Sequence, residues 1–431
     1  MIPLPIFILI PLVACIIGYL FTKFKIRSKG SIPLIASLTT TALSIYIAFD
    51  TPSNFSIEWI HQWDIDFELS INGVSNIFIA VCSMAFLVQT ILSLNKQKSS
   101  LYWCMNLLLQ AAIFSFVLTQ NLAIRVISWE LCWVPIFIIL VNTEKGHTAI
   151  KFSKIWFVAQ TLLIGGTIIL TGKFNVIYEA AFWCMLIALL IRTYLNVSSS
   201  LKPETTILTN VIMPLLPIIF FINTILPNFY EYVKDNSLLI AIFICTVSLI
   251  WVFKLITSKA ISAIYSVNIL VFSGFILVWL LKPELQILQL CVQIIMAKTF
   301  LNILMSYYGE DDNSILSKWV FVISILLSFG FSGVIIGIPT LKILSLWGIY
   351  QQAIAISILS LISVLFITTI IKTSKLFNNI TPVSKEKKWL EIIKLIAVSI
   401  IFVSIIVALV DPSYINDNVK RYSQTDLTGE R

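Results

Sequence analysis

Long apolar runs separated by short polar links make up most of the chain. A helix needs roughly 20 apolar residues to cross a bilayer core, and about 14 runs approach this length. The expected spans are residues 3–21, 32–49, 74–94, 101–119, 122–141, 151–171, 176–195, 207–226, 238–257, 260–281, 286–306, 318–348, 350–372 and 390–410. The pattern predicts an all-α membrane protein, a single polytopic domain over residues 1–431.

Helix breakers occur in two regions, residues 203–217 and residues 318–348. The breakers are Pro203, Pro214 and Pro217 in the first region, and Gly330, Gly333, Gly337 and Pro339 in the second. An interrupted helix at membrane depth requires protein or water to satisfy the freed backbone groups, and such breaks often mark a transport path. The alternative is a plain proline kink with no function.

Composition supports lipid as the main solvent. The chain is 58% hydrophobic and only 12% charged, and its mean hydropathy is +0.97. A soluble core of this size could not bury so much apolar surface. Despite the net charge of +8, these values exclude a disordered or nucleic-acid-binding protein.

Lysine placement predicts the orientation in the membrane. The lysine-rich segments 22–31, 95–100, 142–154 and 372–388 fall on one side, which is expected to be cytoplasmic. The acidic segment 50–72 falls on the other side, and both termini lie outside. The first basic cluster (Lys23, Lys25, Arg27 and Lys29) follows the first apolar run, which indicates a membrane span and not a cleaved signal peptide.

Glu130 lies near the middle of its expected span. A carboxylate at that depth costs about 2.5–3.5 kcal/mol on insertion scales, so a cationic partner, a bound proton or water must offset the cost. Glu130 is therefore a candidate for an ion or proton relay, the alternative being a structural hydrogen bond between helices.

Four basic residues lie in or beside apolar runs: Arg192, Lys254, Lys298 and Lys342. Arg192 stays protonated and can only influence a neighbour, whereas a desolvated Lys298 can release its proton. The side chain of Lys254 is expected to extend to the membrane surface. For Lys342, both extension to the surface and a role within the membrane stay open. The only histidines, His61 and His147, fall in expected loops, so no histidine relay is expected within the membrane.

No redox or nucleotide-binding motif occurs in the chain. There is no P-loop or Gly-rich nucleotide loop. The seven cysteines all lie in apolar runs and form no CxxC pair, so disulfides and a zinc site are not expected. The chain is expected to bind no cofactor itself.

An ordered set of short motifs resembles the antiporter-like membrane subunits of respiratory complex I, most closely the subunit M (mitochondrial subunit 4) type. The motifs are Asn72-Gly73-Val74-Ser75, Leu107 to Ala111, Ser128 to Leu131 with Pro135, Thr148 to Phe152, Ala188 to Arg192, Pro203-Glu204, Ile264-Tyr265-Ser266 and Ser328 to Gly333. The resemblance spans roughly residues 55 to 410.

The resemblance implies two inverted five-helix repeats with broken helices, about 101–226 and 238–372. It also implies a subunit of an NADH:quinone oxidoreductase that couples quinone reduction to proton translocation. NADH, FMN, iron–sulfur clusters and quinone would then be bound by partner subunits. The expected partners are other membrane-arm subunits and lipid, and the expected location is the cell inner membrane, or the mitochondrial inner membrane if organellar.

The relay residues of that family carry over in part. Glu130 matches the fifth-helix glutamate, and Arg192 stands where the family has a seventh-helix lysine. The fourth-helix glutamate is Gln110, and residues 207–226 contain no lysine. The family's later positions fall at Ala297, beside Lys298, and at Thr340, near Lys342. The candidate relay is thus Glu130, Arg192, Lys298 and Lys342.

Four hypotheses remain at this point. The chain is a proton-translocating subunit of complex I, or a pump-impaired structural subunit of the same assembly. It is otherwise a subunit of a multisubunit cation/proton antiporter or membrane-bound hydrogenase, since a shared fold does not separate these machines. A stand-alone transporter is the fourth.

Overall fold

The computed structural model describes residues 3–24, 30–49, 54–60, 65–71, 73–94, 99–143, 146–172, 178–195, 215–257, 276–278, 280–281 and 284–308. The helices of its first part are α1 (Ile6–Lys23), α2 (Ser31–Phe49), α3 (Gly73–Ser93), α4 (Ser100–Leu118), α5 (Leu122–Leu131), α6 (Trp133–Thr143), α7 (Gly146–Thr171) and α8 (Tyr178–Leu195). The later helices are α10 (Leu215–Phe220), the π-helical η4 (Phe221–Ile225), α11 (Leu226–Asn228), α12 (Tyr230–Asp235), α13 (Ser237–Thr257) and α15 (Leu285–Tyr308). The chain divides into two compact units, with the boundary between Leu189 and Leu190 inside α8.

Membrane-length helices dominate the first unit. Four described helical stretches are long and apolar enough to cross a membrane: Val74–Ile91, Ser100–Leu118, Leu122–Asn142 and Ala149–Thr171. The first four expected spans coincide with α1 to α4 within three residues at every end. The described part is therefore a mainly helical membrane protein, as the apolar runs predicted. The expected total of 14 spans and the paired repeats stay predictions.

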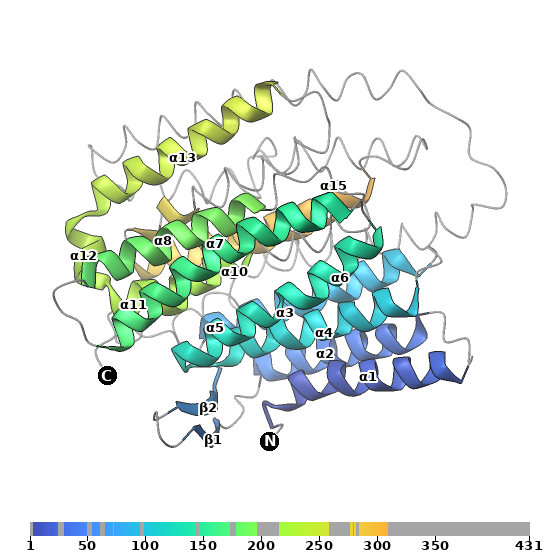
Figure 1. Cartoon of the computed structure of the whole chain (residues 1–431). Coiled ribbons are helices and arrows are strands. Elements are labelled where there is room, and N and C mark those ends of the chain that lie inside the picture. Colours follow the sequence, from blue (N-terminus) through green and yellow to red (C-terminus); the bar gives the residue numbers. More distant parts are fainter. Residues whose placement is uncertain are drawn as a thin grey trace. The chain divides into compact units, whose positions relative to one another are not determined.

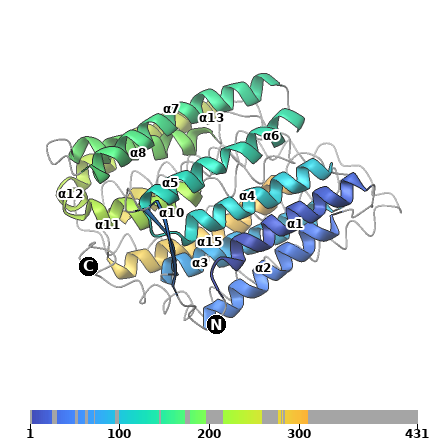
Figure 2. The same cartoon turned by 60° about the horizontal axis from the view of Figure 1, so that its bottom comes forward.

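Helices α1 to α4 of the first unit pack against one another. Helix α1 contacts α4 and α2, and α2 also contacts α3. Figures 1 and 2 both show α1 and α2 lying side by side. Aromatic rings fill the interior, where Phe114 packs edge-on against Phe7 and Phe86, with ring centroids 5.9 and 6.5 Å apart.

Several polar side chains in this unit are buried among the apolar ones, and some large apolar side chains are exposed. Ile16 and Tyr19 of α1 are 59% and 64% exposed, whereas Gln110 of α4 is 1% exposed. The Gln110 amide donates a hydrogen bond to Thr40 Oγ1 of α2 at 3.1 Å, and Ser83 of α3 donates one to Ser44 of α2 at 2.9 Å. Interhelical hydrogen bonds of this kind hold helices together in lipid.

The expected extramembrane segment 50–72 contains a β-hairpin, so the fold is not purely helical. Strands β1 (Phe55–Ile60) and β2 (Ile65–Leu69) pair antiparallel, with an irregularity between Glu58 and Ile60. The end of β2 joins the turn after α4, since Ser70 N donates to Leu118 O at 3.0 Å and Gln120 N to Glu68 O at 3.2 Å. Figure 1 shows the hairpin beside the start of α5.

The expected fifth span is two helices, and the reason is Pro135. Helix α5 ends at Leu131, and α6 begins at Trp133. Proline at 135 removes the amide that would bond to the Leu131 carbonyl, and its ring clashes with that carbonyl. The expected span at 122–141 is thus correct in extent but wrong in continuity.

The link between the expected spans 122–141 and 151–171 is also shorter than predicted. Helix α7 begins at Gly146, so the backbone of His147 is helical and Lys151 and Lys154 lie in the first turns of α7. The placement of His147 in a loop was therefore wrong. His61, the Gly/Pro-rich region 318–348 and the last two expected spans lie outside the described residues.

The eighth expected span, 207–226, is described from residue 215 onward. Pro217 lies within α10, and the helix then widens to the π-helical turn η4. Pro203 and Pro214 lie outside the described residues. A π-helical turn inside a helix frequently accompanies a functional site. The described residues 215–228 stay helical through this turn, and the interruption expected at residues 203–217 stays a prediction.

Gly30, just before α2, allows a close approach that a side chain would prevent. Its φ of +84° is left-handed, and a Cβ there would lie 2.9 Å from Leu94 Cδ2 and 3.1 Å from Trp103 Cζ2. We expect Gly30→Ala to reduce the free energy of unfolding by about 2 kcal/mol, from backbone strain and overpacking together. The measurement is denaturant unfolding in detergent.

Gly18→Ala serves as the control for this prediction. A Cβ at Gly18 would meet only Cys104 Sγ, at an ordinary 3.9 Å. Equal losses in the two variants would contradict the role assigned to Gly30.

Candidate functional site

Glu130 lies in the last turn of α5, next to the helix break. The Asn121 side chain caps the N-terminus of this helix. It accepts hydrogen bonds from the amides of Ala123 and Ile124 at 3.0 and 3.3 Å. The helix stops at Leu131 because of Pro135. The residues around Glu130 thus place a carboxylate at a helix end inside a membrane span.

An indole from α7 holds the carboxylate of Glu130. Trp156 Nε1 donates a hydrogen bond to Glu130 Oε2 at 2.8 Å, and Trp156 is only 1% exposed. Glu130 itself is partly buried. An indole N–H is a donor only. Trp156 can therefore orient the carboxylate but cannot pass on its proton.

The neighbouring residues fix α5 against α4. Trp129 is fully buried and packs on Phe116, with ring centroids 5.3 Å apart. One residue earlier, Ser128 Oγ and Ser115 Oγ lie within hydrogen-bond distance at 2.8 Å. Helix α4 thus contacts α5 through Trp129 and Ser128, while α7 holds Glu130 through Trp156.

Arg125, which was not among the predicted relay residues, is a second charged residue on α5. It is 2% exposed, and its guanidinium donates a hydrogen bond to the carbonyl of Thr119 at the end of α4. Five positions separate Arg125 from Glu130, so the two are not neighbours on one helix face. The available signal was an arginine inside the apolar run Ile124-Arg125-Val126.

The other candidate relay residues belong to the second unit or lie outside the described residues. Arg192 lies in the last turn of α8, is 3% exposed and belongs to the second unit. Lys298 lies on α15, also in the second unit, and only its backbone is described. Lys342 lies outside the described residues. The grouping of these residues into one relay stays a prediction.

Gln110, which the resemblance places at a fourth-helix glutamate, contacts α2. Its amide donates to Thr40, and its side chain has no titratable proton in the relevant range. Lys254 lies in the last turn of α13. Among the described residues, no group of three or more His, Cys, Asp or Glu side chains is placed to hold a metal ion.

Comparison with known proteins gives one relative in sequence. Over 185 residues the chain is 25% identical to the F(420)H(2) dehydrogenase subunit M of Methanosarcina mazei. The match covers 40% of this chain. It covers 36% of the relative, which is about a third of that protein's length. No model of a known protein family matches the chain.

The fold is shared with chains of solved complexes, among them the following three. A chain of respiratory complex I from Thermus thermophilus with bound NADH matches with a TM-score of 0.74 and 12% identity, covering 99% of this chain and 100% of that chain. A chain of the archaeal membrane-bound sulfane sulfur reductase matches with a TM-score of 0.75 and 11% identity, covering 99% and 97%. A chain of the Mrp complex from Dietzia sp. DQ12-45-1b matches with a TM-score of 0.73 and 9% identity, covering 97% and 52%.

Together these likenesses confirm the resemblance predicted from the short motifs. The chain resembles the antiporter-like subunits of complex I-type membrane assemblies, and it is divergent in sequence from each relative given above.

Proposed function

We propose that the chain is a membrane-arm subunit of a complex I-type oxidoreductase, NADH:quinone oxidoreductase being the principal candidate. It couples quinone reduction to proton translocation through a charged relay that includes Glu130. The observation that carries the proposal is this carboxylate inside a membrane span, at a helix break and held by the Trp156 N–H at 2.8 Å. Ionisable groups at such depth are rarely without function.

The chain contributes no redox chemistry of its own in this proposal. NADH, FMN, the iron–sulfur clusters and quinone bind to partner subunits, while this chain responds to their turnover by moving protons. Its partners are other membrane-arm subunits and lipid, and its location is the cell inner membrane, or the mitochondrial inner membrane if organellar. The names of the relatives include a dehydrogenase of F420H2 and a sulfane sulfur reductase, so the electron donor and acceptor differ among machines of this fold.

A structural role in the same assembly is the second candidate. Two observations favour it: Gln110, at the position of a family glutamate, is engaged as an amide by Thr40, and Arg192, at the position of a lysine, cannot readily release a proton. In this role the chain spaces other subunits and carries no complete proton path.

The proposal is tested in inside-out membrane vesicles from cells with and without the chain. Acidification is followed after addition of NADH, and quinone reduction is measured in parallel. The proposal predicts fewer protons moved per quinone reduced when the chain is absent. An unchanged number of protons per quinone reduced favours the structural role. Exchange of Na⁺ for H⁺ without any electron donor favours a subunit of a cation/proton antiporter.

Replacing Trp156 by Phe tests whether the indole positions Glu130. The ring packing is retained and the hydrogen bond to Glu130 Oε2 is lost. A hydrogen bond to a charged group contributes about 1.5–3 kcal/mol, so we expect the rate of proton translocation to fall by about tenfold. The measurement is vesicle acidification normalised to the amount of assembled protein.

Trp133→Phe is the matched control. Trp133 lies in α6 and stacks on Phe137, with ring centroids 5.0 Å apart. Translocation that falls equally in both variants would show that loss of any nearby indole, and not of the bond to Glu130, is responsible.

A further inference from the structure

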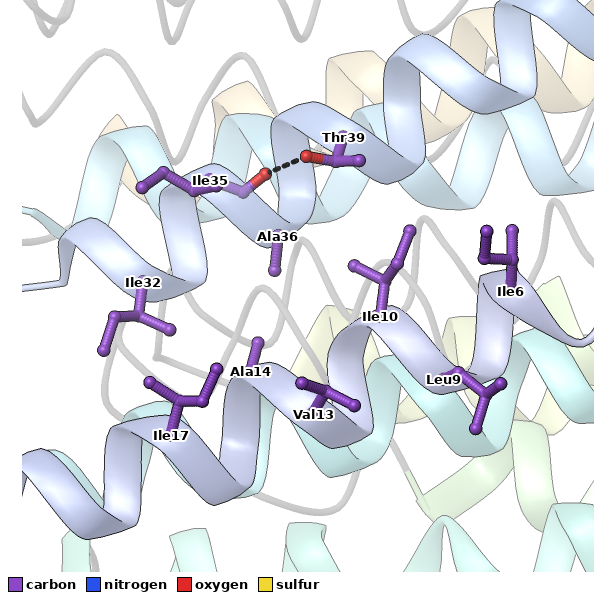
Figure 3. Close-up of a pocket in the computed structure, with 10 residues that line it drawn as sticks. All are labelled: Ile6, Leu9, Ile10, Val13, Ala14, Ile17, Ile32, Ile35, Ala36 and Thr39. Atoms are coloured by element: carbon purple, nitrogen blue, oxygen red, sulfur yellow. Dashed lines mark hydrogen bonds between the residues drawn. The ribbon is translucent and has the colours of Figure 1, made fainter.

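Helix α2 borders two interfaces of opposite character. Toward α1 lies an apolar groove of about 520 Å³, and among its described lining residues only Thr39 has a polar side chain (Figure 3). The Thr39 hydroxyl donates to the Ile35 carbonyl of its own helix at 2.8 Å. Toward α3 and α4, by contrast, α2 makes hydrogen-bonded contacts between buried side chains. These contacts pair Ser37 with Thr90, Ser44 with Ser83 and Thr40 with Gln110. A buried polar seam therefore joins α2, α3 and α4.

One turn before Gln110 on α4, three further buried side chains meet between α3 and α4. Gln89 of α3 is fully buried, and Tyr102 and Asn106 of α4 are 5% and 2% exposed. Gln89 Nε2 donates to Tyr102 Oη at 3.3 Å and to Asn106 Oδ1 at 3.4 Å. Both bonds are long, since an N–H donor usually lies about 2.7–3.2 Å from its acceptor. We call these three residues the amide cluster.

The protein satisfies only one end of the Gln89 amide. Gln89 Oε1 is buried and accepts no hydrogen bond from the described residues. Turning the amide over by 180° would exchange its oxygen and nitrogen, so the buried NH₂ group would then lack an acceptor. A buried polar atom without a hydrogen bond is costly in free energy. Either orientation of the amide therefore calls for a small polar partner that the described side chains do not supply.

The amide cluster lies close to the ends of both helices. Gln89 is four residues before Ser93, the last residue of α3, and Tyr102 is two residues after Ser100, the first residue of α4. Four helical residues span about 6 Å. Ser93 is also one turn beyond Gln89 on the same face of α3, and it is 6% exposed. A small molecule therefore reaches Gln89 within about one helical turn of the helix ends, beside a hydroxyl group.

We propose that the amide cluster binds a water molecule that enters at the ends of α3 and α4. Water both donates and accepts, so it satisfies Gln89 in either orientation of the amide, and a buried water typically makes about three hydrogen bonds to such groups. A metal cation fits less well, because the three side chains are uncharged and hard cations such as Ca²⁺ and Mg²⁺ take about six or more oxygen ligands. The site is independent of the function proposed above, because it contains none of the relay residues.

Hydroxyl-radical footprinting of the protein, in the complex with which it purifies, tests the proposal. X-rays generate radicals from bound water in place, and mass spectrometry then locates the modified side chains. We expect modification of Tyr102 despite its burial, and none of Phe114, which is fully buried against other aromatic rings. Gln89→Leu should lower the modification of Tyr102 about fivefold, which is the effect on occupancy of losing one ordinary hydrogen bond.

Gln110→Leu is the matched control. The Gln110 amide is also buried, but it donates directly to Thr40 at 3.1 Å, so its loss should leave the modification of Tyr102 unchanged. A second measurement needs no variant: a cryo-EM map of the wild-type complex that resolves ordered water should contain density about 2.7–3.2 Å from the Gln89 amide. An unmodified Tyr102, equal losses in the two leucine variants, or a map without this density would overturn the proposal. So would a modification of Tyr102 that falls when Na⁺ replaces K⁺ in the buffer, since that result would indicate a bound cation.

Discussion

Replacing Glu130 by Gln is expected to lower quinone-coupled proton translocation by about 10²-fold, the lower end of what a positioned proton-transfer group contributes. The amide keeps the size of the side chain, and its oxygen can still accept the hydrogen bond from Trp156 Nε1. The variant therefore removes the ionisable group while retaining the contact between α5 and α7. The measurement is acidification of inside-out vesicles, with quinone reduction followed in the same sample.

Glu179→Gln provides the control for the loss of a carboxylate. Glu179 is exposed in the first turn of α8 and should translocate protons normally as Gln. Normal proton translocation in Glu130→Gln, with the complex assembled, would favour the structural role and remove Glu130 from the relay.

Replacing Gly166 by Leu is expected to lower the free energy of unfolding by about 3 kcal/mol. Helix α7 approaches α8 at this residue, and a Cβ there would lie 2.8 Å from Met185 Cγ and 3.0 Å from the Ala181 carbonyl oxygen. The backbone oxygen cannot move without displacing the helix. Close helix approach at small residues is a main source of stability in membrane bundles, so the substitution should separate α7 from α8.

The adjacent glycine gives a matched control. A Cβ at Gly165 would meet nothing within 4 Å, and Gly165→Leu should change the free energy of unfolding by no more than about 0.5 kcal/mol. Denaturant unfolding of both variants in the same detergent compares them directly. Similar losses at the two positions would contradict the packing described for Gly166.

Apolar run length was enough to predict the first helices, because the bilayer sets a minimum length for each span. It did not predict the break after Leu131. Pro135 was visible in the sequence as part of a family motif, and the backbone rule for proline would have placed the break four residues before it.

The hairpin also had a local signal. Residues Ser56 to Ile60 and Ile65 to Leu69 alternate polar and apolar side chains in large part, as a half-buried strand does. The acidic composition of segment 50–72 led instead to an expected loop. Strand pairing and the junction with the end of α4 depend on contacts distant in sequence, which a pattern along the chain does not contain.

Of the candidate site, Glu130 was predictable and its partner was not. A charge inside an apolar run is conspicuous, whereas Trp156 is one of 12 tryptophans and lies 26 positions further along the chain. Only the packing of α7 beside α5 selects it. Arg125 has the same kind of signal as Glu130, and its guanidinium donates a hydrogen bond to the carbonyl of Thr119.

Purification from native membranes tests most directly whether this chain works inside a complex I-type oxidoreductase. The tagged protein is extracted in mild detergent, its co-purifying subunits are identified by mass spectrometry, and the eluate is assayed for NADH:quinone activity. We predict redox subunits and quinone reduction in the eluate. A protein that purifies alone, or with antiporter subunits and no redox partner, would contradict the claim.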